Sequence, residues 1–63
     1  MNRINQMIDL YATNAATAFI QAKIADGFGY SEEVEDLLTE MLIQREELQM
    51  WIKISQAVRG WQL

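Results

Sequence analysis

The 63-residue sequence contains no cysteine, no histidine and no proline. Without cysteine there is no disulfide, and without cysteine or histidine the commonest zinc ligands, general bases and thiol nucleophiles are missing. Ser31 and Ser55 have no neighbouring base to activate them, and no phosphate-binding glycine loop is present. We therefore expect no catalytic residue, no metal site and no cofactor, and a chain that is not an enzyme. The lack of proline favours long uninterrupted helices, because an interior proline costs about 3 kcal/mol.

Positive charge is also scarce, with five Lys and Arg against nine Asp and Glu and a net charge of −4. This balance disfavours binding to nucleic acid or to anionic membranes, where Lys and Arg supply most of the affinity. The longest uncharged run, residues 10–22, contains Asn, Gln and Thr and is shorter than the roughly 20 apolar residues that a membrane span needs. We expect a cytoplasmic protein with no membrane segment.

The chain has a high fraction of hydrophobic residues for its short length. A single domain of this length, residues 1–63, buries only about 60% of the surface that its unfolded chain exposes. Yet 51% of its residues are hydrophobic, more than two helices with one shared seam can hide. Small domains without disulfides or metals are commonly stabilised by oligomerisation, so we expect a homo-oligomer, with a dimer favoured.

Apolar residues alternate at spacings of 4 and 3 from about residue 3 to residue 26, which predicts the first helix. This seam contains Ile4, Ile8, Tyr11, Ala15, Ala18, Ala22 and Ala25. Alanine at successive seam positions predicts a close approach of a second helix. Met7, Ala12 and Phe19 flank the seam, and we expect them to widen the buried face.

A glycine-containing turn, residues 27–31, separates the two helices. Gly27 suits the left-handed position that follows a helix, and Ser31 suits the N-cap of the next one. The second helix is predicted for about residues 32–59, with Gly60 as its stop. Its seam contains Val34, Leu37, Met41, Gln44, Leu48, Trp51, Ser55 and Val58, with Leu38, Leu42 and Ile52 beside it. Gln44 and Ser55 are polar breaks of the kind that fix register or oligomeric state.

A connection this short makes the helices antiparallel neighbours. The predicted fold is all-α: an antiparallel helical hairpin with coiled-coil-like packing that dimerises into a four-helix bundle. We assign to this packing and self-association the seam residues Ile4, Ile8, Tyr11, Ala15, Ala18, Ala22, Ala25, Leu37, Met41, Leu48 and Trp51.

Each predicted helix also has a second apolar stripe that points away from its seam. The stripes contain Leu10, Ile20 and Ile24 in the first helix, and Ile43, Met50, Ile54, Ala57 and Trp61 in the second. One interpretation is burial against a second copy, and the other is a face that binds another protein's helix. Trp61 follows Gly60 near the terminus, where an aromatic residue needs something to pack on, and we expect it to be an exposed anchor.

Acidic residues crowd the start of the second helix, at Glu32, Glu33, Glu35, Asp36 and Glu40. Favourable interaction with the helix dipole and a solvated face explain such a cluster, and the functional alternatives are a docking patch for a basic partner and a hard-metal site. Phe28 and Tyr30 in the turn either cover the end of the bundle or contact a partner. The candidate partner-binding residues are Ile43, Met50, Ile54, Trp61, Glu32, Glu33 and Asp36.

These features favour a non-enzymatic protein–protein interaction module, such as a small adaptor, inhibitor or chaperone-like accessory protein of bacterial or phage type. In length and heptad pattern the chain also resembles Rop, a helical hairpin that dimerises into a four-helix bundle. That resemblance implies an RNA-binding regulator with a basic face, whereas the five basic residues here, Arg3, Lys23, Arg45, Lys53 and Arg59, are spread along both helices. A structural component of a larger assembly is a further alternative.

Overall fold

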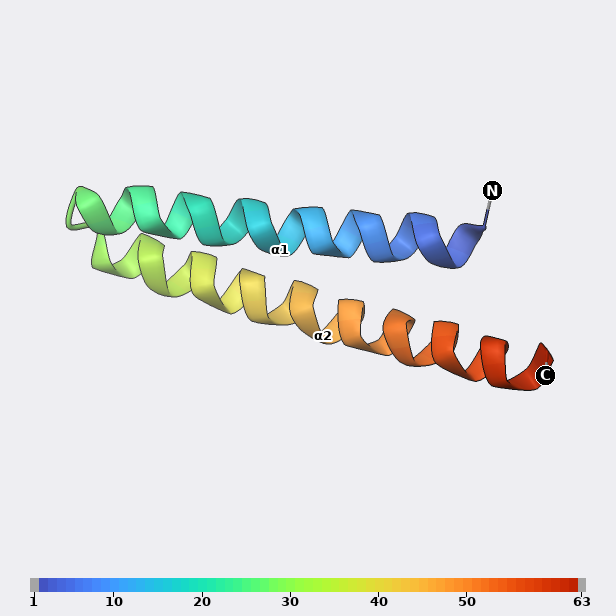
Figure 1. The fold of residues 1–63 in the computed structure, drawn as a ribbon. Coiled ribbons are helices and arrows are strands. Elements are labelled where there is room, and N and C mark those ends of the chain that lie inside the picture. The colour runs from blue at the N-terminus through green and yellow to red at the C-terminus, as the bar shows by residue number, and fades with distance from the viewer. Residues whose placement is uncertain (1, 63) are drawn as a thin grey trace.

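The structure, a computed structural model, describes residues 2–62 of the chain. It consists of helix α1 (Arg3–Gly27) and helix α2 (Ser31–Gln62), which run antiparallel and are joined by three residues (Figure 1). No strand occurs among the described residues. The predicted all-α helical hairpin is confirmed.

Helix α1 begins and ends with well-defined caps. The side chain of Asn2 accepts a hydrogen bond of 2.7 Å from the backbone N–H of Ile4, which satisfies one of the free donors of the first turn. At the other end, Gly29 N–H donates to Asp26 and Tyr30 N–H donates to Ala25, both at 3.0 Å. This pair of bonds is a Schellman motif, which requires a left-handed residue just past the helix.

Gly29 is that left-handed residue, with a φ of 76°, so the prediction for Gly27 is wrong by two positions. Gly27 is instead the last residue of α1. Both glycines belong to the predicted turn, and only the hydrogen-bond pattern distinguishes them. The prediction for Ser31 is wrong by one residue, since the carbonyl of Tyr30 already accepts from Val34 N–H at 3.0 Å and Ser31 is the first residue of α2.

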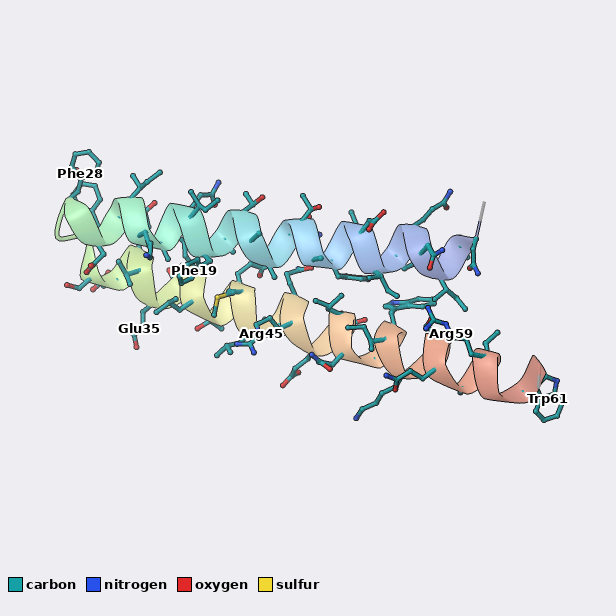
Figure 2. The ribbon with its side chains drawn as sticks, in the orientation of Figure 1. Phe19, Phe28, Glu35, Arg45, Arg59 and Trp61 are labelled. Carbon is teal, nitrogen blue, oxygen red and sulfur yellow. The ribbon has the colours of Figure 1, made fainter. Side chains whose placement is uncertain are left out.

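Helix α2 also continues past its predicted stop, through Gly60 to Gln62. Glycine within a helix costs only about 1 kcal/mol relative to alanine, so it need not end one that other residues favour. Because α2 has 32 residues and α1 has 25, the last turns of α2 extend beyond α1. A groove shared by Asn2, Ile4 and Val58 marks the level at which α1 starts, and Trp61 lies past it (Figure 2).

The seam of α1 contains the only buried side chains of the described residues, which are Ala15, Ala18, Ala22 and Ala25. The bulkier seam residues Ile4, Ile8 and Tyr11 are half-buried near the open end of the hairpin. Figure 1 shows the helices closest at the turn and farther apart toward the termini. This shape follows the sequence, because alanine permits close approach and the larger side chains hold the helices apart.

The hairpin has a thin core. Its Cα atoms span 51 × 18 × 11 Å, so one layer of two helices makes up the whole structure. Phe19 was predicted to widen the buried face but is 45% exposed, and Ala12 beside it is exposed as well. A single partner helix covers only the seam, and no other element of residues 2–62 lies over its flanks.

Candidate interaction surface

The two flanks of the seam form two distinct faces of the hairpin. On one side, Asn14 Nδ2 donates to Gln44 Oε1 at 3.3 Å, and Gln44 Nε2 donates to Glu40 Oε1 at 2.7 Å. A groove near the turn brings together Gln21 of α1 and Glu33 of α2 on this same flank. Residues seven apart along a helix lie on the same side of it and form a heptad column. Each residue in these contacts therefore shows on which side of the hairpin its whole column lies.

We call this side the acidic face. Its columns contain Arg3, Met7, Leu10, Asn14, Thr17, Gln21 and Ile24 of α1, Phe28 of the connection, and Glu33, Asp36, Glu40, Ile43, Glu47, Met50, Ile54, Ala57 and Trp61 of α2. Four acidic residues and one basic residue give it a net charge of −3.

The opposite side, which we call the neutral face, is identified by a groove that Asn5 of α1 and Arg59 of α2 line together. By heptad steps it contains Asn5, Asp9, Ala12, Ala16, Phe19, Lys23 and Asp26 of α1, and Glu35, Leu38, Leu42, Arg45, Gln49, Ile52, Gln56 and Arg59 of α2. Its three acidic and three basic residues give no net charge.

The middle of the neutral face is apolar. Phe19 extends from α1 toward α2 (Figure 2), and the ammonium group of Lys23 lies 5.2 Å from the centre of its ring. Leu38 and Leu42 are 37% and 54% exposed on the adjacent turns of α2. This face was not predicted from the sequence, because Phe19, Leu38 and Leu42 were expected to be buried beside the seam.

Most of the predicted partner-binding residues belong to the acidic face. Trp61, Ile43 and Met50 are 90%, 50% and 45% exposed there, and Ile54 is partly exposed. Glu33 and Asp36 join them, whereas Glu32 belongs to the back column of α2 with Glu46 and Lys53. In α1, Leu10 and Ile24 belong to the acidic face, but Ile20, 58% exposed, is on the back of its helix.

The residues predicted for self-association lie in the seam between the two helices of one chain. The α1 and α2 seams face each other within one chain, and the four alanines are already buried there. In this conformation they hold the hairpin together and are not free to contact a second copy. Any further association uses the flanks or the backs of the helices.

Apolar groups mark both ends of the acidic face, with acidic residues between them. At the turn, the rings of Phe28 and Tyr30 stack with their centres 5.6 Å apart. At the other end, Ile54, Ala57, Val58 and Trp61 line an apolar hollow near the C-terminal end of α2. The face therefore offers carboxylates along its middle and apolar contacts beyond them.

Two polar groups interrupt the seam. Gln44, predicted as a polar break, is satisfied by its bonds to Asn14 and Glu40. The indole N–H of Trp51 is buried and has no hydrogen-bond partner among the described residues. An unsatisfied buried donor costs about 1–3 kcal/mol.

Within residues 2–62, no group of three or more acidic side chains is arranged to hold a metal ion. Neither described helix combines the length and the apolar character that crossing a membrane requires. No protein family matches the chain, and no curated protein or solved structure is significantly similar to it. The function is therefore argued from the surface itself.

Proposed function

We propose that this chain is a non-enzymatic protein–protein interaction module that acts as an oligomer of helical hairpins. Its acidic face binds an amphipathic, basic helix of another protein. An adaptor, an inhibitor and a chaperone-like accessory protein all act through such a contact.

One observation carries the proposal: the hairpin exposes more surface than a self-sufficient monomer. A compact protein of 7.3 kDa has an accessible surface of about 4,200 Å², and this chain has 5061 Å², an excess of roughly 900 Å². Much of the excess is apolar, because Ile43, Met50 and Trp61 each expose 45% or more of their surface. Apolar area of this kind favours burial against another chain.

The arrangement of the acidic face suggests the chemistry of the partner. The carboxylates of Glu33, Glu40 and Glu47 recur every seven residues, at the spacing of two helical turns. A helix laid along them could pair Lys or Arg with these groups and place apolar residues against Ile54 and Trp61. This is the helix-in-groove mode, with aromatic anchors as energetic centres.

A synthetic peptide provides the test. We would measure fluorescence anisotropy of a labelled amphipathic helix built from leucine and lysine, with the leucine and glutamate counterpart as the charge control. The lysine peptide should bind, more weakly as salt rises, and the glutamate peptide should not. Trp61→Ala and Ile54→Ala should each weaken binding about 10-fold, an effect typical of anchor residues.

Ile20→Ala is the matched control, because Ile20 is apolar, 58% exposed and on the back of α1. It should leave affinity unchanged. Equal binding of both peptides, or affinity for the lysine peptide that survives both alanine substitutions, would contradict the proposal. Circular dichroism would establish that each variant keeps its helicity.

The Rop-like RNA-binding alternative has less support. A phosphate-binding surface needs several basic side chains on one side, and the five here are divided among both faces and the back of α2. A structural role in a larger assembly would use the same apolar surface as the adaptor role, and differs from it only in the permanence of the contact.

A further inference from the structure

We infer that two hairpins associate through their neutral faces, antiparallel, with the turn of each chain beside the open end of the other. The inference deepens the proposed function and rests on it only for the premise that the hairpin acts as an oligomer. It specifies which face binds a second copy and in which orientation, and it leaves the acidic face for another protein.

Charge selects the face. In a two-fold dimer each face contacts its own copy, so contact through the acidic face would oppose a net charge of −3 to another of −3. Like charges brought together at an interface are destabilising, and a central row of carboxylates would be desolvated as well. The neutral face carries no net charge, and Phe19, Leu38 and Leu42 lie near its middle.

The area also agrees with a dimer. One broad face, 51 Å by 18 Å, has a footprint of about 900 Å², close to the roughly 800 Å² that each partner buries in a standard interface. The same figure matches the excess surface of the hairpin. Covering one face is therefore enough to give the chain the surface expected of a folded subunit.

Charge along the hairpin selects the orientation. The half nearer the turn, residues 15–44, contains six acidic residues and one basic residue, a net charge of −5. The remaining residues contain three acidic and four basic residues, a net charge of +1, and the two halves together account for the total of −4. A parallel pair would bring the two −5 halves together, whereas an antiparallel pair places each beside a +1 half.

Three glutamate substitutions at nearly equal exposure test the choice of face. Leu42 on the neutral face, Ile43 on the acidic face and Ile20 on the back of α1 are 54%, 50% and 58% exposed. Sedimentation equilibrium of the intact chain should give about twice its mass of 7.3 kDa. Leu42→Glu should raise the dissociation constant of the dimer on the order of 100-fold or more, because each subunit would bury an unpaired charge.

Ile43→Glu and Ile20→Glu should leave the dimer intact. Phe19→Ala is a second, milder variant of the neutral face, and it should weaken the dimer while circular dichroism at high concentration stays helical. A chain that remains monomeric at every concentration overturns the inference. That result would hold whether or not the neutral face binds another protein. A dimer sensitive to Ile43→Glu and insensitive to Leu42→Glu overturns it too.

The orientation has its own measurement, since a chain without cysteine can be labelled at one chosen site. A spin label on Ser31→Cys reports the distance between the two turns. Antiparallel association predicts a separation approaching the 51 Å length of the hairpin, and a separation near its 18 Å width would overturn that orientation. The peptide-binding test of the acidic face can fail or succeed independently of this dimer, because Leu42 lies on the neutral face and does not contribute to the acidic face.

Discussion

Replacing Ala22 with leucine should destabilise the hairpin by about 1–3 kcal/mol, the usual cost of overpacking. Ala22 is 3% exposed and lies between buried Ala18 and Ala25 in the part of the seam where the helices come closest. The three-residue connection holds α1 and α2 together at this end, so the added atoms cannot be accommodated by simple separation of the helices. A domain of 63 residues has a stability of roughly 3–9 kcal/mol, and the loss would be a large part of it.

Urea unfolding followed by circular dichroism would measure the change, at one protein concentration because association contributes to apparent stability. Ala57→Leu is the matched control, since Ala57 is exposed on α2 away from the seam, and leucine and alanine both favour helix. Its stability should change by less than about 0.5 kcal/mol. If Ala22→Leu were as stable as the parent chain, the close approach of the helices would not be what the alanines provide.

Three further predictions concern the caps and the charge. Gly29→Ala should lower the free energy of unfolding by about 1–2 kcal/mol, because Gly29 has a positive φ. Gly60→Ala should raise the free energy of unfolding by about 0.5–1 kcal/mol, because Gly60 lies within α2 and nothing is near the added methyl group. Thermal melts of the two variants would show shifts of opposite sign. Asn2→Ala should cost about 1 kcal/mol by removing the N-cap bond, and Asn5→Ala, its exposed neighbour, should cost less in the same melts. In a gel-shift series at about 50 mM salt, where phosphate contacts are strong, the chain should not retard an RNA hairpin, and retardation would revive the Rop-like alternative.

The hairpin itself was predictable because its signal is repeated many times. Seven seam positions in the first helix and eight in the second reinforce one another, and the loss of any one, such as the polar Gln44, does not change the period. The four seam alanines of α1 were correctly assigned to the helix contact, and all four are buried. Repetition of this kind depends only on backbone geometry, so it can be read without knowledge of any tertiary contact.

Single-residue signals were less reliable. Gly27 and Gly29 have the same intrinsic freedom, and the choice between them depends on where the Schellman bonds form. Gly60 was expected to end a helix that in fact continues to Gln62, because the residues around it favour the helix more than one glycine disfavours it. Phe19 was expected to be buried, but it is 45% exposed, because α2 covers only the seam of α1 and not this flank.

The pairing of flanks across the hairpin follows from the predicted fold, because antiparallel helices whose seams are in contact set like flanks opposite each other. The link from Asn14 through Gln44 to Glu40 lies on the flank that also contains Ile43 and Ile54 of α2. The sequence-based prediction grouped residues by helix alone, so it did not recognise the division of charge between the two faces.

That division allows one small chain to have two kinds of contact. If hairpins pair through their neutral faces, each acidic face remains on the outside, and the two-fold axis sets the two acidic faces on opposite sides of the bundle. Each would carry its own Trp61, at opposite ends of the dimer because the chains run antiparallel. A partner with a single basic helix would then bind at a ratio of one helix per hairpin, and two partner molecules would be joined by one dimer. Disruption of the dimer by Leu42→Glu should therefore abolish the joining of partners while leaving the affinity of each acidic face unchanged, which separates an adaptor from a simple inhibitor.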